Sequence, residues 1–398
     1  MAFKERLFER SPCSWTWHFA KESDWTALAP SPERMDAAST LVKQNPLRKV
    51  FRRDSYFIKI EEPKPQFGLS WLKSVFAPKA KSEFDSLLAL CDAGVKAVEP
   101  VAYGSAGAAQ GLITRAFEGS ISVSDYYYSE FSYGSRCPDA FLKSWAAFIK
   151  RFIASGFLHP DFHNGNILYQ PFSGDFCLVD VFGVKRAGGL STAERESMLR
   201  IVFEMRCGLS PAQLAVLAAD CGAEGDPLNY VERGLEQEAR RLAAEWPKRK
   251  RQLLEGYGKF VRKTVDSQGR ELWLLLDKAR RPMASAEELE PGRFEVVENG
   301  IEDMLAAFRL ELALLPHRRA VAWRPETGAA FFERTEPSGA VSNEELASLG
   351  FYAARFGIDL EGVKLGRDSS GRLLICDCAF GPLLQKGVRA QSATSPRI

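Results

Sequence analysis

Residues 157–168 are the most informative segment of the chain and read Phe157-Leu158-His159-Pro160-Asp161-Phe162-His163-Asn164-Gly165-Asn166-Ile167-Leu168. Apolar spacing predicts a helix over 141–154 before it, and an apolar run predicts a buried strand over 176–181 after it. Asp161 and Asn166 are separated by four residues, and Asp180 lies at the end of the predicted strand. This order allows Asn166 and Asp180 to face the same metal ions.

These residue types suit one kind of chemistry. Phosphoryl transfer needs a carboxylate near the acceptor hydroxyl, oxygen ligands for Mg²⁺, and a cation on the nucleotide phosphates. Asp161 is the candidate base, and Asn166 and Asp180 are the candidate Mg²⁺ ligands. Alone, each has an ordinary explanation as a turn or loop residue. Their ordered combination favours a functional role over that explanation.

The same segments resemble the protein-kinase-like superfamily. His159-Pro160-Asp161 through Asn166 is similar to its catalytic loop, and Leu178-Val179-Asp180-Val181-Phe182-Gly183 is similar to its metal-binding strand and turn. The resemblance covers roughly residues 40–260. It implies an α+β, two-lobed kinase-like fold, with a strand-rich N-lobe, a helical C-lobe, and ATP and Mg²⁺ as cofactors.

The resemblance also implies which residues bind ATP. Lys59, in the second strand of a hairpin predicted over 49–60, is expected to contact the α- and β-phosphates. Glu83, in a helix predicted over 79–93, is expected to hold Lys59 in place. Further ATP contacts are expected from the residues that lead into the linker between the lobes, which are Arg115, Ala116 and Phe117. No Gly-rich loop precedes Lys59, so the backbone over 45–49 is expected to cover the phosphates.

Three segments are most similar to the bacterial lipopolysaccharide kinases that phosphorylate Kdo or heptose. They are residues 43–59, 79–104 and 155–168. The similarity implies a sugar of the lipopolysaccharide core as acceptor, and a peripheral contact with the cytoplasmic face of the inner membrane. Pro160 stands where activated protein kinases have an arginine, and no A-P-E segment follows Gly183, so a protein substrate is disfavoured.

Two other functions stay open. The segment 155–168 also resembles aminoglycoside and choline kinases, which act on soluble small molecules. A pseudokinase scaffold would use the region 266–398 as its interaction surface. The presence of Lys59, Asp161 and Asp180 argues against the scaffold.

Both histidines of the loop have a structural alternative. His159 is expected to support the loop by packing and hydrogen bonding, because Asp161 already holds the position of the base. His163 could contact the acceptor or simply make a loop hydrogen bond, and the sequence favours neither.

The bulk composition excludes several classes of protein. Lys plus Arg (53) nearly balances Asp plus Glu (51), and this net charge of +2 argues against a nucleic-acid-binding protein. A basic run over 240–251 could meet phosphates or a membrane, but a solvated helix face is the favoured reading. No secretion signal or membrane-spanning run is visible, and the eight cysteines lack C-x-x-C spacing, so we expect a soluble cytoplasmic protein with reduced thiols.

The predicted domains are an N-terminal extension (1–39), an N-lobe (40–117), a C-lobe (118–265) and a C-terminal α+β region (266–398). In the C-terminal region, Gly371 to Gly381 faintly repeats the pattern from Gly174 to Gly183. A degenerate second kinase-like unit and a chance similarity explain this equally well. The region contains no Asp-x-x-x-x-Asn before that segment, so no catalysis is assigned to it.

Overall fold

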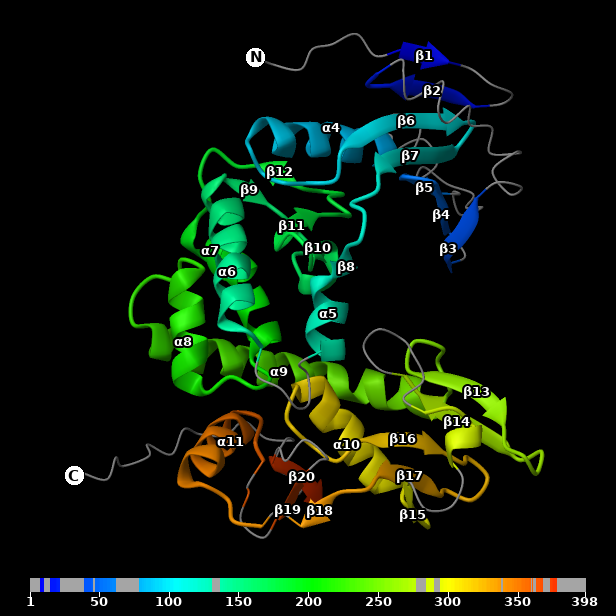
Figure 1. Ribbon diagram of the computed structural model, residues 1–398, viewed down its shortest axis with the longest axis vertical. Helices are drawn as coiled ribbons and strands as arrows, with labels where there is room; N and C mark the ends of the chain where they lie inside the picture. The colour runs from blue at the N-terminus through cyan, green and yellow to red at the C-terminus, as the bar shows by residue number, and fades with distance from the viewer. Residues whose placement is uncertain are drawn as a thin grey trace. The chain divides into compact units, whose positions relative to one another are not determined.

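Figure 1 shows a computed structural model of the chain. The structure describes residues 8–10, 15–21, 39–45, 47–61, 79–130, 137–276, 284–289, 294–337, 339–358, 360, 363–367 and 373–377. The segment 63–78, between the hairpin of 49–60 and the helix that follows it, lies outside the described residues. The chain forms two compact units, one made of residues 1–123 and 140–201 and the other of residues 124–139 and 202–398.

The first unit is built on a seven-stranded antiparallel sheet with the order β1-β2-β6-β7-β5-β4-β3. Its strands are β1 (Phe8–Arg10), β2 (Thr16–Phe19), β3 (Thr40–Asn45), β4 (Arg48–Arg53), β5 (Tyr56–Glu61), β6 (Pro100–Ala106) and β7 (Ala109–Arg115). The hairpin predicted over 49–60 is confirmed as β4 and β5.

Strand β2 comes from the predicted N-terminal extension and lies beside β6. Trp17 of this strand is fully buried. A Cβ at Gly104 would lie 2.6 Å from the Trp17 ring, and one at Gly111 would lie 2.5 Å from it. Glycine is therefore required at both positions, because only a residue without a side chain leaves space for the indole.

Helix α4 (Lys79–Asp92) confirms the predicted helix and packs on β6 and β7 (Figure 1). It buries Phe84, Leu87 and Leu90, whose spacing puts them on one helix face. The helix ends at Gly94, which has φ 74°. Strand β6 begins at Pro100, and the turn before it pairs with strand β11 (Asp175–Leu178) through the parallel bridge Ala97↔Leu178.

Helix α6 (Asp139–Ala154) leads into the catalytic-loop segment. Its Trp145 is fully buried, and the indole Nε1–H donates a hydrogen bond to Asn164 Oδ1 over 2.9 Å. The loop then forms β9 (Phe157–Leu158), the short 3-10 helix η1 (Asn164–Asn166), β10 (Ile167–Gln170), β11, and β12 (Lys185–Arg186). The strand predicted over 176–181 ends at Leu178, because Asp180 has φ 53° and leaves the extended conformation.

The helical segment after β12 has two parts. Residues Thr192–Leu199 form α7, and Arg200–Met205 continue as the 3-10 helix η2. Ser191 begins α7 with a capping box in which Glu194 is the partner.

The second unit contains helices and two small sheets. Among the described residues, its α-helices are α5 (Val123–Glu130), α8 (Pro211–Asp220), α9 (Pro227–Leu254), α10 (Ile301–Ala313) and α11 (Asn343–Arg355). A five-stranded antiparallel sheet has the order β13-β14-β16-β17-β15, from β13 (Val261–Val265), β14 (Glu271–Leu275), β15 (Phe294–Val297), β16 (Ala320–Trp323) and β17 (Ala330–Glu333). The smaller sheet joins β18 (Glu336–Pro337), β19 (Lys364–Arg367) and β20 (Leu373–Asp377). The predicted α+β class, with a strand-rich N-terminal sheet and a further α+β region at the C-terminus, is confirmed.

The basic run over 240–251 lies on α9. Arg241 pairs with Glu238 and Glu245, and Arg249 also pairs with Glu245. Such pairs at helical spacing are typical of a solvated helix face. The favoured reading of this run therefore has structural support.

Candidate active site

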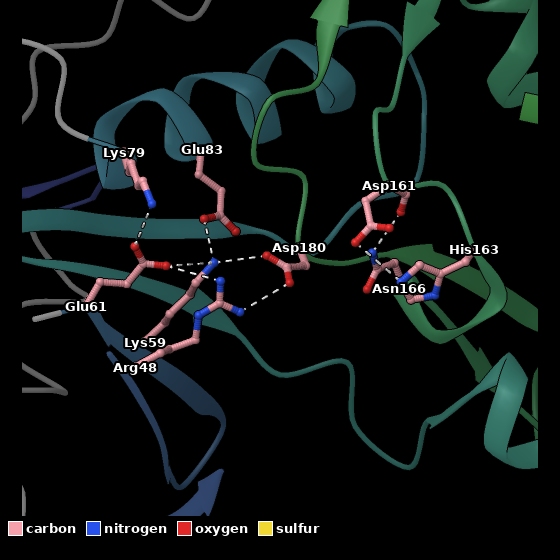
Figure 2. Close-up of polar contacts among 9 residues, drawn as sticks. All are labelled: Arg48, Lys59, Glu61, Lys79, Glu83, Asp161, His163, Asn166 and Asp180. Atoms are coloured by element: carbon pink, nitrogen blue, oxygen red, sulfur yellow. Dashed lines mark hydrogen bonds and ion pairs between the residues drawn. The ribbon is translucent and has the colours of Figure 1, made fainter. Parts of the chain in front are cut away.

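Strand β5, helix α4 and the turn after β11 bring three predicted site residues together. Lys59 Nζ lies 2.7 Å from Glu83 Oε2 and 3.0 Å from Asp180 Oδ1 (Figure 2). The side chain of Lys59 is 14% exposed and that of Glu83 is 6% exposed. The ammonium group of Lys59 is therefore held in one position by two carboxylates, the buried one of Glu83 and that of the candidate metal ligand Asp180.

Burial and charge act in opposite directions on the two acids. Burial raises the pKa of Glu83 above its ordinary value, and the neighbouring Lys59 offsets only part of this. Burial also acts to raise the pKa of Asp180, but Lys59 and Arg48 outweigh it, so the net pKa of Asp180 is lowered. Asp180 is therefore ionised at neutral pH, as a Mg²⁺ ligand must be.

The structure adds Arg48 and Glu61 to the residues found from the sequence. Arg48 Nη1 lies 3.3 Å from Asp180 Oδ2, and Arg48 Nη2 lies 3.2 Å from Glu61 Oε1. Arg48 opens β4, directly after the turn of the β3–β4 hairpin, in the segment expected to cover the phosphates. The sequence showed Arg48 only as a basic residue in the glycine-free segment 45–49, which is expected to cover the phosphates. Its contact with Asp180 joins residues that are too far apart in the chain for local spacing to predict.

The catalytic loop brings Asp161 and Asn166 together. Asn166 Nδ2 donates a hydrogen bond to the backbone oxygen of Asp161 over 3.0 Å. The backbone N–H of Val179 donates to the Asn166 carbonyl over 3.0 Å, which places Asn166 beside the residue that precedes Asp180. The Asp161 side chain is 81% exposed and lies 3.6 Å from His163 Nε2. Figure 2 shows Asp161, His163 and Asn166 grouped beside Asp180.

The donor set fits Mg²⁺. Asn166 offers an amide oxygen and Asp180 a carboxylate, and a magnesium site is typically completed by waters and substrate phosphates. Within the described residues, no group of three or more His, Cys, Asp or Glu side chains could hold a metal ion by itself. In the structure, Lys59 and Arg48 each contact one oxygen of the Asp180 carboxylate.

His159 supports the loop through an acceptor nitrogen. The backbone N–H of Asp161 donates to His159 Nδ1 over 3.2 Å, and the ring is 3% exposed. Burial lowers the pKa of His159 to about 4. A neutral ring is required, because protonation of Nδ1 would turn the acceptor into a donor and break the loop bond.

The depressed pKa of His159 predicts a pH dependence of stability. Because the unfolded histidine takes up a proton near pH 6.5 and the folded one only near pH 4, stability should fall as pH is lowered through this window. The loss attributable to this ring is up to about 3 kcal/mol. His159→Asn keeps an acceptor but does not titrate, so urea unfolding between pH 7 and pH 4 should show a shallower decline. Parallel declines in the two proteins would contradict the neutral, loop-supporting ring.

The three residues expected to contact ATP near the linker have protein partners. Arg115 Nε lies 2.9 Å from Glu99 Oε2, and the Ala116 N–H donates to the Ser55 carbonyl over 2.7 Å. Lys96 lies over the Phe117 ring at 5.4 Å. A role of Arg115, Ala116 and Phe117 in ATP binding stays a prediction.

The comparison with protein families identifies the central part of the chain. Residues 69–195 match the Lipopolysaccharide kinase (Kdo/WaaP) family. The predicted resemblance is confirmed for this stretch, which carries Glu83, Asp161, Asn166 and Asp180. Kinases are phosphotransferases, so this match also confirms the predicted enzyme class. Lys59 and Arg48 lie before the matched residues.

Two solved structures are similar to parts of the chain. WaaP, solved in complex with acyl carrier protein, is 17% identical, with 54% of this chain and 90% of that chain covered at a TM-score of 0.40. WbdD, solved with the kinase inhibitor LY294002, is 18% identical, with 48% of this chain and 44% of that chain covered at a TM-score of 0.35. No curated protein matches the chain. Among the described residues, no helix is both long and apolar enough to cross a membrane.

Proposed function

We propose that the protein transfers the γ-phosphate of ATP, with Mg²⁺, to a hydroxyl of a Kdo or heptose sugar of the lipopolysaccharide core. The observation that carries the proposal is the Lys59–Glu83 pair joined to Asp180, within a chain whose residues 69–195 match the lipopolysaccharide kinases. Such a lysine–acid pair beside a metal-binding aspartate is what phosphoryl transfer requires.

Each residue has a part in the transfer. Lys59 binds the α- and β-phosphates, and Glu83 keeps its ammonium group in place. Asn166 and Asp180 would hold Mg²⁺, which supplies charge neutralisation on the phosphates. Asp161, whose carboxylate is exposed, accepts the proton of the acceptor hydroxyl as that oxygen attacks the γ-phosphorus.

We further propose that the acceptor is reached from the cytoplasmic face of the inner membrane, with the protein in peripheral contact. A core sugar on lipid A presents its hydroxyls at the membrane surface, so an exposed base is an advantage. The open side of Asp161 supports this arrangement.

The test is transfer to defined acceptors. The purified chain with radiolabelled ATP and Mg²⁺ should label lipopolysaccharide from a strain whose core lacks phosphate, and chemical release of Kdo and heptose should show which sugar carries the label. Labelling of an aminoglycoside or of choline, with none of the core, would favour a small-molecule kinase instead.

Arg48 provides a further prediction. When Asp180 binds the metal ion, we expect the Arg48 guanidinium to turn from it to the nucleotide phosphates, in place of the backbone amides of a Gly-rich loop. Arg48→Ala should weaken Mg·ATP binding by about 10-fold or more, since a charge-assisted hydrogen bond contributes about 1.5–3 kcal/mol. Titration calorimetry measures the change.

A matched control lies on the same strand. Arg52 is more exposed and pairs with Glu118 over 2.7 Å. Arg52→Ala should leave Mg·ATP binding within about twofold, because exposed pairs contribute little. Equal effects of the two substitutions would remove Arg48 from the site.

A further inference from the structure

The second unit repeats the strand order of the first. In the first unit, β1-β2-β6-β7-β5 form consecutive neighbours, and in the second unit β13-β14-β16-β17-β15 do the same. Every pair in both series is antiparallel. In each, the helix that packs on the sheet, α4 or α10, connects the third strand in sequence to the fourth. Figure 1 shows α10 lying against its own sheet.

The two sheets also share an irregularity at one position. The register shifts between Pro100 and Ala102 where β6 pairs with β7, and between Ala320 and Ala322 where β16 pairs with β17. The extra residue is a fully buried valine in both cases, Val101 and Val321. A bulge is a specific local feature, so its recurrence aligns the two sheets residue by residue.

The turn that follows α4 and the turn that follows α10 have the same hydrogen bond and the same backbone conformation. The N–H of Val95 bonds to the Leu90 carbonyl, as the N–H of Leu315 bonds to that of Leu310. Gly94 has φ 74°, and Leu314 keeps the same left-handed conformation with φ 56° although leucine seldom adopts it.

A hairpin then returns to this turn in both units. The isolated parallel bridge Ala97↔Leu178 of the first unit has its counterpart in His317↔Ile375 of the second. The described part of the sequence echo, Leu373–Asp377, therefore lies in a hairpin equivalent to that of Asp175–Leu178, which chance similarity does not explain.

The second unit has other residues at two positions of the candidate site. From the strand register, Lys59 corresponds to Val297, and from the hairpin register Asn166 corresponds to Lys364. In the same register Asp180 corresponds to Asp377, two residues after the bridged strand position in each unit. The connection 155–166 has its equivalent in 356–364, which is three residues shorter, and Asp359 stands five residues before Lys364 as Asp161 stands five before Asn166. The second unit therefore lacks the strand lysine and the amide ligand of the first, and without them it does not meet the requirements for Mg²⁺-dependent phosphoryl transfer.

A cavity remains at the equivalent place. It measures about 220 Å³, and its walls include Val297, Asp303, Arg318 and Lys364. Asp303 corresponds to Glu83, because Leu310 and Leu90 hold equivalent places in the helix-ending turn. The second unit thus keeps an acidic residue, Asp303, at the helix position of Glu83. A cation is supplied by Lys364 of the hairpin, whereas in the first unit it is Lys59 of the sheet.

Arg318 adds a second cation. Its side chain is 12% exposed, its guanidinium lies 4.4 Å from the centre of the Phe332 ring, and Nη1 pairs with Glu295 over 3.2 Å. Its Nε–H is buried and has no hydrogen-bond partner among the residues that the structure describes. A buried N–H group without a hydrogen-bond partner in the protein is expected where a ligand or a water molecule accepts its hydrogen bond.

We propose that residues 261–377 are a second, degenerate copy of the kinase-like fold, and that its cavity binds a phosphate monoester without a divalent metal ion. The proposal uses the proposed function only for the roles of the residues in the first unit. Lys364 places a fixed positive charge where the first unit would hold Mg²⁺, and Arg318 offers a fork suited to phosphate. The volume is below that of a typical drug-sized pocket, about 300–1,000 Å³, and favours a sugar phosphate over a nucleotide.

The experiment measures binding in the full chain with the first site disabled by Lys59→Ala and Asp180→Ala. Titration calorimetry in EDTA uses glucose 6-phosphate and ADP as probes, and glucose as the uncharged control. We expect one site per chain for glucose 6-phosphate, weaker binding of ADP, and no binding of glucose. Lys364→Gln and Arg318→Gln should each lower the affinity by about 10-fold or more.

Arg319→Gln is the matched control, because Arg319 pairs with Glu333 and is not among the residues that line the cavity. The affinity of the Arg319→Gln variant for glucose 6-phosphate should stay within about twofold of that of the chain with only the first site disabled. The ion pair that it loses, at 3.6 Å near the surface, contributes little. Lys364 is exposed, so its substitution should not unfold the protein. If the disabled chain does not fold, the wild-type chain in EDTA and its Lys364→Gln form give the same comparison.

Absence of binding for both probes, or equal binding by the Lys364→Gln and Arg318→Gln variants, would overturn the proposal. A site that accepts ADP but not glucose 6-phosphate, and still depends on Lys364, would support it with a nucleotide as the source of the phosphate. Loss of sugar kinase activity in the first unit would leave these results unchanged, so the two proposals fail separately.

Discussion

Asp161→Asn should abolish phosphoryl transfer while nucleotide binding survives. The Asp161 carboxylate is exposed and makes no contact with the Lys59 cluster among the interactions that the structure records, so ATP does not depend on it. General base catalysis contributes about 10²–10⁴-fold, and we expect a loss in kcat of at least about 10²-fold. Transfer to the core acceptor is measured by radiolabel, and binding of Mg·ATP by calorimetry.

Two features separate this result from simple damage to the loop. The substitution keeps the backbone oxygen that accepts a hydrogen bond from Asn166 Nδ2, so the loop should keep its form. The affinity of the Asp161→Asn variant for Mg·ATP should therefore stay within about threefold of the wild-type value, because other residues are proposed to bind the nucleotide and the metal ion. Near wild-type turnover with a confirmed acceptor would assign the base to another residue.

Asp180→Ala should remove the dependence of nucleotide binding on Mg²⁺. Its carboxylate is the charged member of the proposed metal pair, and it is held by Lys59 and Arg48. Loss of the acid leaves both cations free for phosphate, so affinity for ATP in EDTA should not fall. Affinity for Mg·ATP should drop by at least about 10-fold, to the value measured in EDTA, and transfer should be lost.

Asp175→Ala is the matched control. Asp175 lies on β11 and pairs with Lys96 over 2.8 Å, and both side chains are about half exposed. The control should keep its response to Mg²⁺, because an exposed pair of this kind contributes little to stability or binding. If Asp180→Ala retained both its Mg²⁺ response and its activity, the metal would lie elsewhere.

Much of the candidate site could be read from local sequence. Asp161 and Asn166 lie within one loop, and the hydrogen bond from the Asn166 amide to the Asp161 backbone spans only that loop. Helices α4 and α6 were predicted because a buried helix face repeats its apolar residues at fixed short spacing. Such features depend on neighbours within a few turns of chain, so they are visible without the fold.

Other features depended on which strand edges meet. Strand β2, from a segment assigned to an extension, lies beside β6, and the contact of Arg48 with Asp180 joins a hairpin to a distant turn. Pairing partners are set by the assembly of the whole sheet, since an exposed edge accepts any strand of suitable register.

The repeat shows the same division between local and tertiary information. Sequence alone left the echo of Gly174–Gly183 in Gly371–Gly381 undecided, because two short strand-turn segments can agree by chance. The shared strand order, the bulged Val101 and Val321, and the two parallel bridges decided it. The residues proposed for the first site could be chosen from the sequence alone, since a few side chains at fixed spacing indicate them. Only the tertiary structure revealed the second copy, because backbone hydrogen bonds preserve a fold after its side chains have changed.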